Sequence, residues 1–265
     1  MIKQLLIFSG VIFTVVLLLL YVMQRHLIYL PSKQIPKRLD YQANDMQSVS
    51  LQTTDGLELR AWYKPAVNQQ ATVLVLHGNA GHIGYRVPLA REFINAGLGV
   101  LLVEYRGYGG NSGHPSELGL YEDGRAGMRF LQQRKVQTKQ LVLYGESLGT
   151  GVAIKLASES PVCAVVLQSP YTSLVDVAHY HYPWLFVKPW DRFDSLGRID
   201  AIHAPLLILH GMKDQVIPYS QGVSLFKQAR EPKEMLSFPE ADHHNLWGNK
   251  AFSSKVIHFI QTKCL

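Results

Sequence analysis

The sequence predicts an α/β domain built on a mostly parallel sheet, with helices on both faces and one transmembrane helix in front of it. Two observations carry this prediction: a long uncharged apolar run opens the chain, and short apolar runs then alternate with helical stretches. Of the 265 residues 47% are hydrophobic, which is enough for one full core. We therefore expect a membrane anchor over residues 1–25, a juxtamembrane linker over 26–44 and one globular domain over 45–265.

The apolar run at the N-terminus extends from Leu5 to Met23 and carries no charge. Its length is close to the ~20 residues with which a helix crosses a bilayer. A cleaved signal peptide would have a shorter apolar segment and small residues at the cleavage site, whereas bulky and basic residues follow this run, from Gln24 to Tyr29. A buried core helix would show a polar face, and this run has none. The run is therefore expected to be a retained single-pass anchor.

Basic residues near the anchor bear on its orientation and on its partners. Lys3 and the terminal amine precede the run, while Arg25, Lys33, Lys37 and Arg38 follow it, so the positive-inside rule favours a globular domain in the cytoplasm. The net charge of +6 suits an anionic lipid surface. Because the sequence has no arginine-rich tract interleaved with aromatics and no helix-turn-helix or zinc-finger spacing, no nucleic-acid partner is expected.

The composition also bears on redox state and on cofactors. Cys163 and Cys264 are too few for a disulfide framework, and Cys163 lies in an apolar run that predicts a buried reduced thiol. No His/Cys cluster in the sequence has zinc spacing and no phosphate-binding P-loop is present. The sequence therefore predicts neither a metal nor another cofactor.

The globular domain is expected to open with a hairpin and to continue as a parallel sheet. Alternating apolar positions over residues 48–62 predict two strands, with the pair Asp55-Gly56 in a type I′ turn. The runs that follow are apolar on both faces, as in strands covered by helices on each side. Ligands of such sheets bind at the carboxyl ends of the strands. The six runs are Thr72–Leu76, Val100–Tyr105, Leu141–Tyr144, Ala164–Leu167, Leu206–Leu209 and Met235–Phe238.

An insert over about residues 171–203 separates the fourth of these runs from the fifth. It is dense in aromatic residues, which predicts a small cap. These residues are Tyr180, Tyr182, Trp184, Phe186, Trp190 and Phe193.

The pattern Gly145-x-Ser147-x-Gly149 directly follows a predicted strand and opens a helical stretch. Its two glycines lack the Cβ atoms that would clash in a sharp strand-to-helix turn, and such a turn projects the serine hydroxyl above the sheet. The pattern alone is short enough to arise by chance. Its strand and helix context makes Ser147 the expected nucleophile.

A serine hydroxyl needs a histidine to take its proton and a carboxylate to orient that histidine. Asp214 lies in the loop after the strand that begins at Leu206, at the correct end of the sheet. His243 follows the last strand and is preferred as the base over its neighbour His244, which is expected to be a flanking or surface residue. His77 is expected to hold its own loop. The weaker carboxylate candidates are Asp176, Asp191, Asp194 and Asp200.

The oxyanion that develops in acyl transfer needs preorganised backbone N–H donors. One donor is expected from Leu148, directly after the nucleophile. The other is expected from Asn79, in the loop after the first parallel strand, where Gly78 and Gly81 let the backbone approach the substrate.

With these residues identified, the chain resembles the α/β-hydrolase superfamily and, within it, the BEM46-like group that includes mammalian ABHD-type membrane-anchored hydrolases. The likeness covers about residues 45–262 and implies an α/β-hydrolase fold with the same triad and oxyanion donors. In that group the last motif usually has Gly before a single histidine, where this chain has Asp242 and a second histidine. The motifs that carry the likeness are His77-Gly78-Asn79-Ala80-Gly81, Tyr105-Arg106-Gly107-Tyr108-Gly109, Gly145-Glu146-Ser147-Leu148-Gly149-Thr150, Ser169-Pro170-Tyr171-Thr172-Ser173 and His210-Gly211-x-x-Asp214.

The sequence thus predicts a serine hydrolase that cleaves carboxylic esters or thioesters through an acyl-enzyme, on apolar or lipid-like substrates at the membrane. Family resemblance fixes mechanism better than substrate. Three alternatives stay open: a carboxylesterase or a peptidase that acts on soluble substrates, and an inactive hydrolase fold that serves as a membrane-bound binding module. A peptidase for cationic peptides would favour an acidic cap, and a binding module would lack a member of the triad. This sequence has an aromatic cap and all three triad residues.

Overall fold

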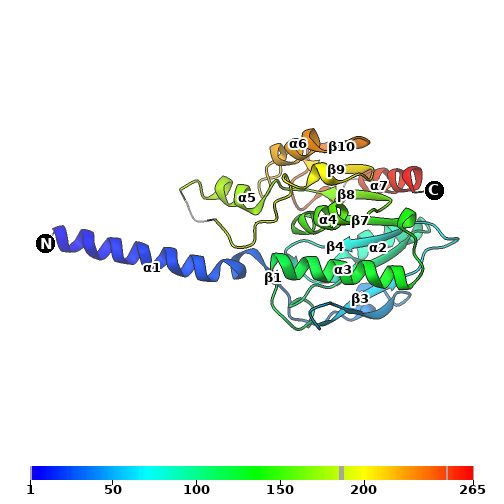
Figure 1. Ribbon diagram of the computed structural model, residues 1–265, viewed down its shortest axis with the longest axis horizontal. Coiled ribbons are helices and arrows are strands. Elements are labelled where there is room, and N and C mark those ends of the chain that lie inside the picture. The colour runs from blue at the N-terminus through cyan, green and yellow to red at the C-terminus, as the bar shows by residue number, and fades with distance from the viewer. Residues whose placement is uncertain (1, 185–187, 249, 265) are drawn as a thin grey trace.

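A computed structural model describes residues 2–184, 188–248 and 250–264 of the chain. One long N-terminal helix projects from a rounded α/β domain, and the two ends of the chain lie on opposite sides of the molecule (Figure 1). The described helices are α1 (Ile2–Ile28), α2 (Val87–Asn95), α3 (Glu117–Gln133), α4 (Leu148–Glu159), α5 (Leu174–His181), α6 (Tyr219–Gln228) and α7 (Lys250–Lys263). Helix α1 is long and apolar enough to cross a membrane.

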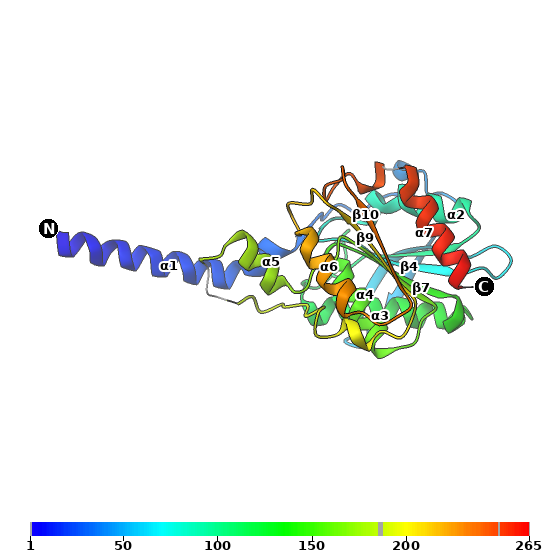
Figure 2. The same cartoon turned by 90° about the horizontal axis from the view of Figure 1, so that it is seen from above.

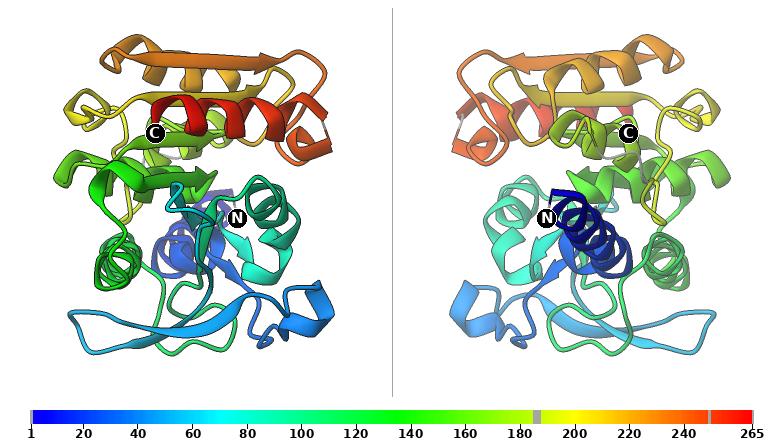
Figure 3. Two further views of the ribbon diagram at one scale, coloured as in Figure 1. Left: turned by 90° about the vertical axis from the view of Figure 1, so that its right-hand side faces the viewer. Right: turned by 90° about the vertical axis from the view of Figure 1, so that its left-hand side faces the viewer.

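Eight of the described strands form one sheet, in the order β10-β9-β8-β7-β4-β6-β3-β2. Strands β2 and β3 pair antiparallel at one edge, and β4 and β6 to β10 run parallel. The bounds are β2 (Gln47–Gln52), β3 (Glu58–Lys64), β4 (Thr72–Leu76), β6 (Gly99–Val103), β7 (Leu141–Glu146), β8 (Ala164–Gln168), β9 (Leu206–Gly211) and β10 (Lys233–Phe238). Seen along α1, the sheet twists from the blue β2–β3 edge to the orange β10 edge (Figure 3). The predicted α/β-hydrolase fold with a mostly parallel sheet is confirmed.

Helices cover both faces of this sheet, as the apolar strands require. Successive side chains of a strand point to opposite faces. Accordingly β4 contributes Val73 and Val75 to one core and Leu74 and Leu76 to the other. Helices α2 and α7 cover the first face of the sheet, and α3, α4 and α6 cover the second (Figure 2). In the sheet β4 lies between β6 and β7, so the chain passes from β4 to β6 on one side and then crosses to β7 on the other side of β4. The crevice where ligands bind in such sheets therefore lies at the carboxyl ends of β4 and β7.

The turn of the first hairpin differs from the predicted type I′. A type I′ turn needs positive φ at both central residues, but only Gly56 has it, at 88°, and Asp55 does not. The Gly56 N–H donates to the carbonyl of Thr53 at 3.2 Å, so the turn is centred one residue earlier than predicted. The reason is tertiary, because both carboxylate oxygens of Asp55 bind the guanidinium of Arg106, at 2.6 and 3.1 Å.

The two cysteines are joined, contrary to the expected reduced thiol at Cys163. Cys163 and Cys264 form a disulfide with a Cα–Cα distance of 5.7 Å across a sequence separation of 101 residues. The bond ties the end of α7 to the residue that precedes β8. No local pattern could predict it, because the pairing depends on how the last helix returns over the sheet.

The C-terminal end of α1 is fastened to the domain. Arg25 forms a two-pronged ion pair with Asp191, with N–O distances of 2.9 and 3.1 Å, and the Tyr29 hydroxyl donates to the same carboxylate at 3.0 Å. Directly after the helix, Leu30–Pro31 (β1) pairs in parallel with Ala80–Gly81 (β5). The segment after the anchor is therefore bonded to the loop that follows β4.

The insert between β8 and β9 holds one described α-helix, α5, on the side of the domain from which α1 projects (Figures 1 and 2). Phe193, grouped by the sequence with the cap aromatics, is instead fully buried, and its ring packs edge-on against Tyr121 at 5.5 Å. Phe186 lies outside the described residues. The exposed aromatic residues of the insert are Tyr180, Tyr182, Trp184 and Trp190.

Candidate active site

Ser147 stands at the sharp turn between β7 and α4. Its φ of 50° and ψ of −116° lie in a region that residues with a side chain rarely adopt. Such strain costs about 1–3 kcal/mol and persists only where the surroundings enforce it. The turn aims the hydroxyl into the crevice at the carboxyl end of the sheet.

The two glycines of the turn are needed because backbone passes where their side chains would be. A Cβ on Gly145 would lie 2.7 Å from the carbonyl oxygen of Gly149, and a Cβ on Gly149 would collide with the carbonyl oxygen of Leu76. Real Cβ atoms essentially never approach other atoms so closely. The spacing of the pattern therefore follows from the close approach of α4 to the ends of β4 and β7.

The structure brings Ser147, Asp214 and His243 into one hydrogen-bonded chain. The Nε2 atom of His243 lies 3.0 Å from Oγ of Ser147, and its Nδ1 atom lies 2.7 Å from Oδ2 of Asp214. Both distances are those of good hydrogen bonds. With Nδ1–H donating to the carboxylate, Nε2 is free to accept the serine proton, which is the arrangement that general-base activation requires.

Asp214 is held by more than His243. Its Oδ1 accepts from the backbone N–H groups of Val216 and Ile217 at 2.9 and 2.8 Å, and its Oδ2 lies 3.4 Å from Nε2 of His210. Burial alone would raise the pKa of Asp214, but hydrogen bonds from the two histidines and the Ile217 amide outweigh it and hold the pKa well below its usual range. The carboxylate is therefore ionised at neutral pH.

The other carboxylates and the second histidine have different surroundings. The His244 side chain is exposed, and its ring centroid lies 5.3 Å from that of His243. Asp176 accepts hydrogen bonds from Thr172 and Ser173 at the start of α5. Asp191 binds the end of α1, as described above, Asp194 caps a turn and Asp200 is exposed. None of these four carboxylates has a described hydrogen bond to Ser147 or His243.

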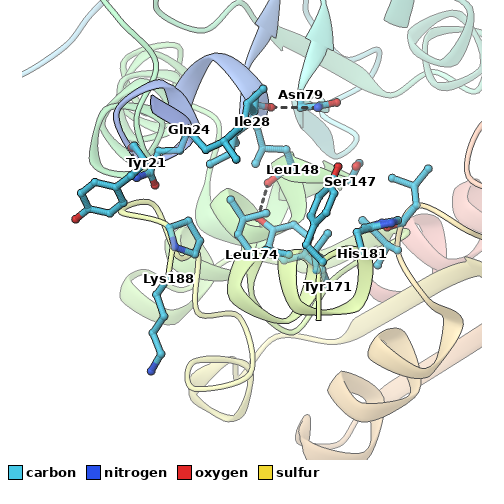
Figure 4. A pocket seen from close by; sticks show the side chains of 18 of the residues that line it. Tyr21, Gln24, Ile28, Asn79, Ser147, Leu148, Tyr171, Leu174, His181 and Lys188 are labelled. Carbon is cyan, nitrogen blue, oxygen red and sulfur yellow. Dashed lines mark hydrogen bonds between the residues drawn. The ribbon is translucent and has the colours of Figure 1, made fainter. Parts of the chain in front are cut away.

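The loop after β4 carries Asn79 to the rim of the crevice, where Asn79, Ser147 and Leu148 line one cavity. A Cβ on Gly78 would lie 3.5 Å from Cβ of Ser147, so the loop passes close beside Ser147. Leu148 is the first residue of α4, and the first N–H groups of a helix have no acceptor within it. The carbonyl of Leu148 accepts the hydroxyl of Tyr171 at 3.1 Å, which steadies this turn (Figure 4).

A buried ion pair and a tyrosine hold the Asn79 loop. Arg86 binds Glu146, the residue before Ser147, through two bonds of 2.9 and 3.0 Å, and donates a third bond to the carbonyl of Ala80. The hydroxyl of Tyr108 donates to the carbonyl of Asn79 at 2.7 Å. The loop is therefore tied to the turn that carries Ser147.

A cavity of about 570 Å³ opens beside Ser147 (Figure 4). Its volume is within the ~300–1,000 Å³ of small-molecule sites. The described lining contains no Asp or Glu, and Lys188, its one Lys or Arg, points its ammonium away from the space (Figure 4). The lining comes from α1, from α5 and the segment after it, and from loops at the ends of β4, β7 and β9, with Leu17, Leu20, Leu27, Leu174, Val177 and Trp184 among it.

Among the described residues, no group of three or more His, Cys, Asp or Glu side chains is arranged to hold a metal ion.

Sequence reasoning did not find the roles of Tyr108, Asp191 and His210. His210 is fully buried in β9, and its Nε2–H donates to the carbonyl of Ile217 at 3.0 Å, which fixes the loop that carries Asp214. His210 begins the sequence motif that ends at Asp214, and this could have drawn attention to it. The motif does not reveal the hydrogen bond of His210 with Ile217. The contact of Asp191 with Arg25 spans 166 positions, and no local pattern marks it.

Comparison with known proteins gives related families and a common fold. Residues 67–190 match a family described as serine aminopeptidase, S33. The chain is 39% identical to the uncharacterized protein Rv2307c of Mycobacterium tuberculosis over 87% of its length and 84% of that protein. It is 30% identical to the protein bem46 of Schizosaccharomyces pombe, over 91% of this chain and 87% of that protein. It is 29% identical to the α/β-hydrolase domain-containing protein WAV2 of Arabidopsis thaliana, over 96% of this chain and 92% of that protein.

Solved structures with the same fold include two esterases. The Pyrococcus furiosus esterase Pf2001 superposes with a TM-score of 0.76 at 19% identity, over 90% of this chain and 99% of that one. The esterase domain of a Rhodothermus marinus protein superposes with a TM-score of 0.62 at 24% identity, over 82% of this chain and 96% of that one. At these identities the likeness shows the fold.

Proposed function

Because the chain belongs to the α/β-hydrolase superfamily, in its BEM46-like group, we propose that it is a serine hydrolase of carboxylic esters or thioesters with Ser147, His243 and Asp214 as its triad. The observation that carries the proposal is the hydrogen-bonded chain from Oγ of Ser147 through His243 to Asp214, with distances of 3.0 and 2.7 Å. Family membership supports hydrolysis, and this geometry supports the serine mechanism.

In the first half of the reaction, Oγ of Ser147 bonds to the acyl carbon while Nε2 of His243 takes the hydroxyl proton. The negative charge that develops on the acyl oxygen meets the backbone N–H groups of Leu148 and Asn79, the proposed oxyanion donors. The intermediate then collapses, and the alcohol or thiol leaves with the proton from His243. Asp214 stabilises the imidazolium throughout and stays ionised, as its lowered pKa indicates.

In the second half, water attacks the acyl-enzyme and gives its proton to His243. Collapse of this second intermediate releases the carboxylic acid and returns the proton to Ser147. The apolar cavity beside Ser147 supports an apolar or lipid-like acyl group, and the esterase activity in the names of the structural neighbours supports an ester rather than an amide.

A peptidase is the second candidate function, because the family that matches residues 67–190 is described as a serine aminopeptidase. An aminopeptidase has to bind a free α-amino group, which calls for a carboxylate near the nucleophile. The described lining of the cavity contains no Asp or Glu. We therefore favour hydrolysis of a lipid-like ester over this candidate and over a carboxylesterase that acts on soluble esters. A membrane-bound binding module without activity is the third alternative.

Helix α1 is proposed as a single-pass anchor, with the membrane as its partner. The charges favour a cytoplasmic catalytic domain, and this is the orientation that we propose. The Cys163–Cys264 disulfide opposes it, because structural disulfides persist in oxidising compartments and are rare in the cytosol. The redox state of this pair in cells therefore tests the orientation.

The experiment that tests the proposed function is fluorophosphonate labelling of the detergent-solubilised full-length protein beside Ser147→Ala, with p-nitrophenyl acetate and p-nitrophenyl palmitate assayed in parallel. We expect labelling and turnover of the wild type and neither in the variant. Labelling of both proteins, or of neither with the fold retained, would contradict the assignment of the nucleophile and favour the binding module. Cleavage of an aminoacyl p-nitroanilide in preference to both esters would favour the peptidase.

A further inference from the structure

The cavity beside Ser147 is not enclosed by the α/β domain alone, because one face of α1 forms part of its wall. Six residues of α1 line it, at the i, i+3, i+4 and i+7 spacings of a single helical face: Leu17, Leu20, Tyr21, Gln24, Leu27 and Ile28. Leu17 and Leu20 are half-buried, whereas Leu18 and Leu19 on other faces are 60% and 54% exposed. A helix suited to a bilayer therefore shares its surface between lipid and the candidate active site.

The wall opposite α1 is α5 together with Tyr182, Trp184, Lys188 and Pro189. Leu174 and Val177 of α5 line the space together with Trp184. Figure 4 shows Tyr21 at one end of the lining and Ser147 toward the other. The cavity therefore runs from the membrane helix to the nucleophile between two largely apolar walls.

The part of α1 that lines this space begins inside the apolar run and ends at the α/β domain. From Leu17 to Ile28 the helix rises about 16 Å. Leu17 and Leu20 belong to the apolar run that ends at Met23, so the outer part of the cavity lies at hydrocarbon depth. The inner part ends at Ser147, which lies in the α/β domain. An acyl chain can thus extend from the bilayer to the nucleophile.

The exposed aromatic residues of the cap indicate that the cap rests on the same membrane surface. Tyr180, Tyr182, Trp184 and Trp190 expose 54%, 53%, 54% and 45% of their surface. The ring of Trp190 packs edge-on against Tyr21 of α1, with a centroid distance of 5.2 Å. Trp and Tyr are enriched where membrane meets water, so Tyr21 and the cap aromatics mark the depth of the interface.

The position of α1 relative to the cavity is held by bonds to the domain. Besides the ion pair of Arg25 with Asp191, the side-chain carbonyl of Gln24 accepts the backbone N–H of Trp190 at 2.5 Å. The carbonyl of Ile28 accepts the side-chain amide of Asn79 at 3.1 Å. The wall is therefore bonded to the domain on both sides of the cavity, at the cap and at the Asn79 loop.

We propose that α1 is part of the substrate site: the acyl chain of a bilayer-resident lipid ester lies between α1 and α5 and reaches Ser147 laterally from the membrane. The inference rests on the proposed serine hydrolase function and names its substrate class. An apolar chain that passes from lipid into an apolar cavity exposes no surface to water on the way. The acyl C–O bond of the ester breaks, the acyl carbon bonds to Oγ of Ser147, and the headgroup alcohol leaves toward the aqueous side with a proton from His243.

The role of α1 as a wall is tested by filling the cavity from the helix. In the full-length protein in detergent, we expect Leu20→Trp to lower the ratio of kcat/KM for p-nitrophenyl palmitate to kcat/KM for p-nitrophenyl acetate by at least about tenfold. Leu19→Trp makes the same substitution on the opposite face of the same helix and is expected to keep the wild-type ratio. Fluorophosphonate labelling of Ser147 reports that the folded site is retained in each variant. A wild-type ratio in Leu20→Trp, or an equal fall in both variants, would overturn the role of α1.

Lateral access is tested by diluting the substrate in the membrane. Full-length protein is reconstituted in phosphatidylcholine vesicles that contain p-nitrophenyl palmitate below saturation, and phosphatidylcholine is added to the same vesicles at constant bulk substrate. Lateral access predicts that a tenfold lower mole fraction of the ester in the bilayer lowers the rate about tenfold. A rate that stays unchanged, as the constant bulk concentration of the ester would give, would overturn lateral access. A wild-type protein that hydrolyses neither ester and takes up no fluorophosphonate would instead refute the proposed function itself.

Discussion

The side-chain amide of Asn79 donates a hydrogen bond of 3.1 Å to the backbone carbonyl of Ile28, the last residue of α1 (Figure 4). The carbonyl of Asn79 accepts two further bonds, from the N–H of Leu30 at 2.9 Å and from the hydroxyl of Tyr108 at 2.7 Å. Asn79 is also a proposed oxyanion donor. The end of α1 and the loop that is expected to stabilise the transition state are thus directly bonded to each other.

The bond between Asn79 and Ile28 can be removed without removing the backbone N–H that would serve the oxyanion. We expect Asn79→Ala to lower kcat/KM for p-nitrophenyl acetate about fivefold, because a hydrogen bond of this kind contributes about 1 kcal/mol to holding the loop. Asn95→Ala, at the exposed end of α2, is the matched control and is expected to keep wild-type activity. Equal activity of the two variants would show that the contact does not position the loop.

The two neighbouring histidines are expected to differ sharply in their effect on activity. His243→Ala removes the group that links Ser147 to Asp214 and should lower kcat by roughly 10⁴-fold. His244→Ala removes an exposed ring and should change kcat less than about twofold. Rates with p-nitrophenyl acetate and circular dichroism of both variants provide the measurement. The reverse order of effects would assign the base to His244.

Gly149, two residues after Ser147, should be intolerant of a single methyl group. Gly149→Ala places a Cβ against the carbonyl oxygen of Leu76, so the start of α4 has to move, and we expect a loss of about 3 kcal/mol in the free energy of unfolding. Gly10→Ala, in α1, meets nothing within 4 Å and is the control. Thermal unfolding in detergent compares the two, and equal melting temperatures would contradict the packing argument.

The contact of Asp55 with Arg106 predicts a pH-dependent contribution to stability. Hydrogen bonds from Arg106 and Thr53 lower the pKa of Asp55 from 3.8 to about 2. Because the folded-state pKa lies below the unfolded value, the contribution is complete above about pH 4 and is lost as the pH falls through 2. The Asp55 side chain is 46% exposed, so solvent screening limits the contribution to under about 1 kcal/mol.

Asp55→Asn should therefore be slightly less stable than the wild type at pH 7, and most of this difference should have disappeared at pH 2. Urea unfolding of both proteins at pH 7, 4 and 2 measures the difference. A difference that stayed constant over this range would mean that the charge of Asp55 does not stabilise the fold.

The redox state of the cysteine pair tests the proposed cytoplasmic orientation of the α/β domain. In the proposed cytoplasmic orientation the reducing cytosol would open the Cys163–Cys264 disulfide that the structure shows, so both side chains should be thiols in growing cells. Cells lysed in denaturant with a maleimide polymer, without reductant, should then yield a doubly modified chain. Modification only after reduction would show that the disulfide exists in the cell and would place the domain in an oxidising compartment, and a chain with both cysteines changed to Ser is the unlabelled control.

The strands and the nucleophile turn could be predicted from the sequence because their signals are local. Apolar β-branched runs mark the six parallel strands, whose observed ends differ from the predicted ends by no more than two residues. The spacing of Gly145, Ser147 and Gly149 predicts a sharp turn without room for side chains at the two glycines. In the structure the backbone of α4 and β4 occupies that room. Chain order and loop placement predicted Asp214 and His243 as partners of Ser147, and the structure joins the three by hydrogen bonds although His243 lies 29 positions from Asp214 and 96 from Ser147.

What the sequence by itself determined is thus the order of the elements, the long apolar helix at the N-terminus and the choice of Ser147, Asp214 and His243 as candidates for the proposed site, because each is marked by periodicity, by short-range stereochemistry or by its place after a strand. Only the tertiary structure decided the pairing of Cys163 with Cys264, the turn at Asp55, the bond of Asp191 to Arg25 and the place of α1 in the wall of the cavity. These contacts join segments that are distant in the chain and depend on where whole elements pack. The physical reason is that a contact between distant segments is decided by the packing of the complete core, which no window of sequence contains.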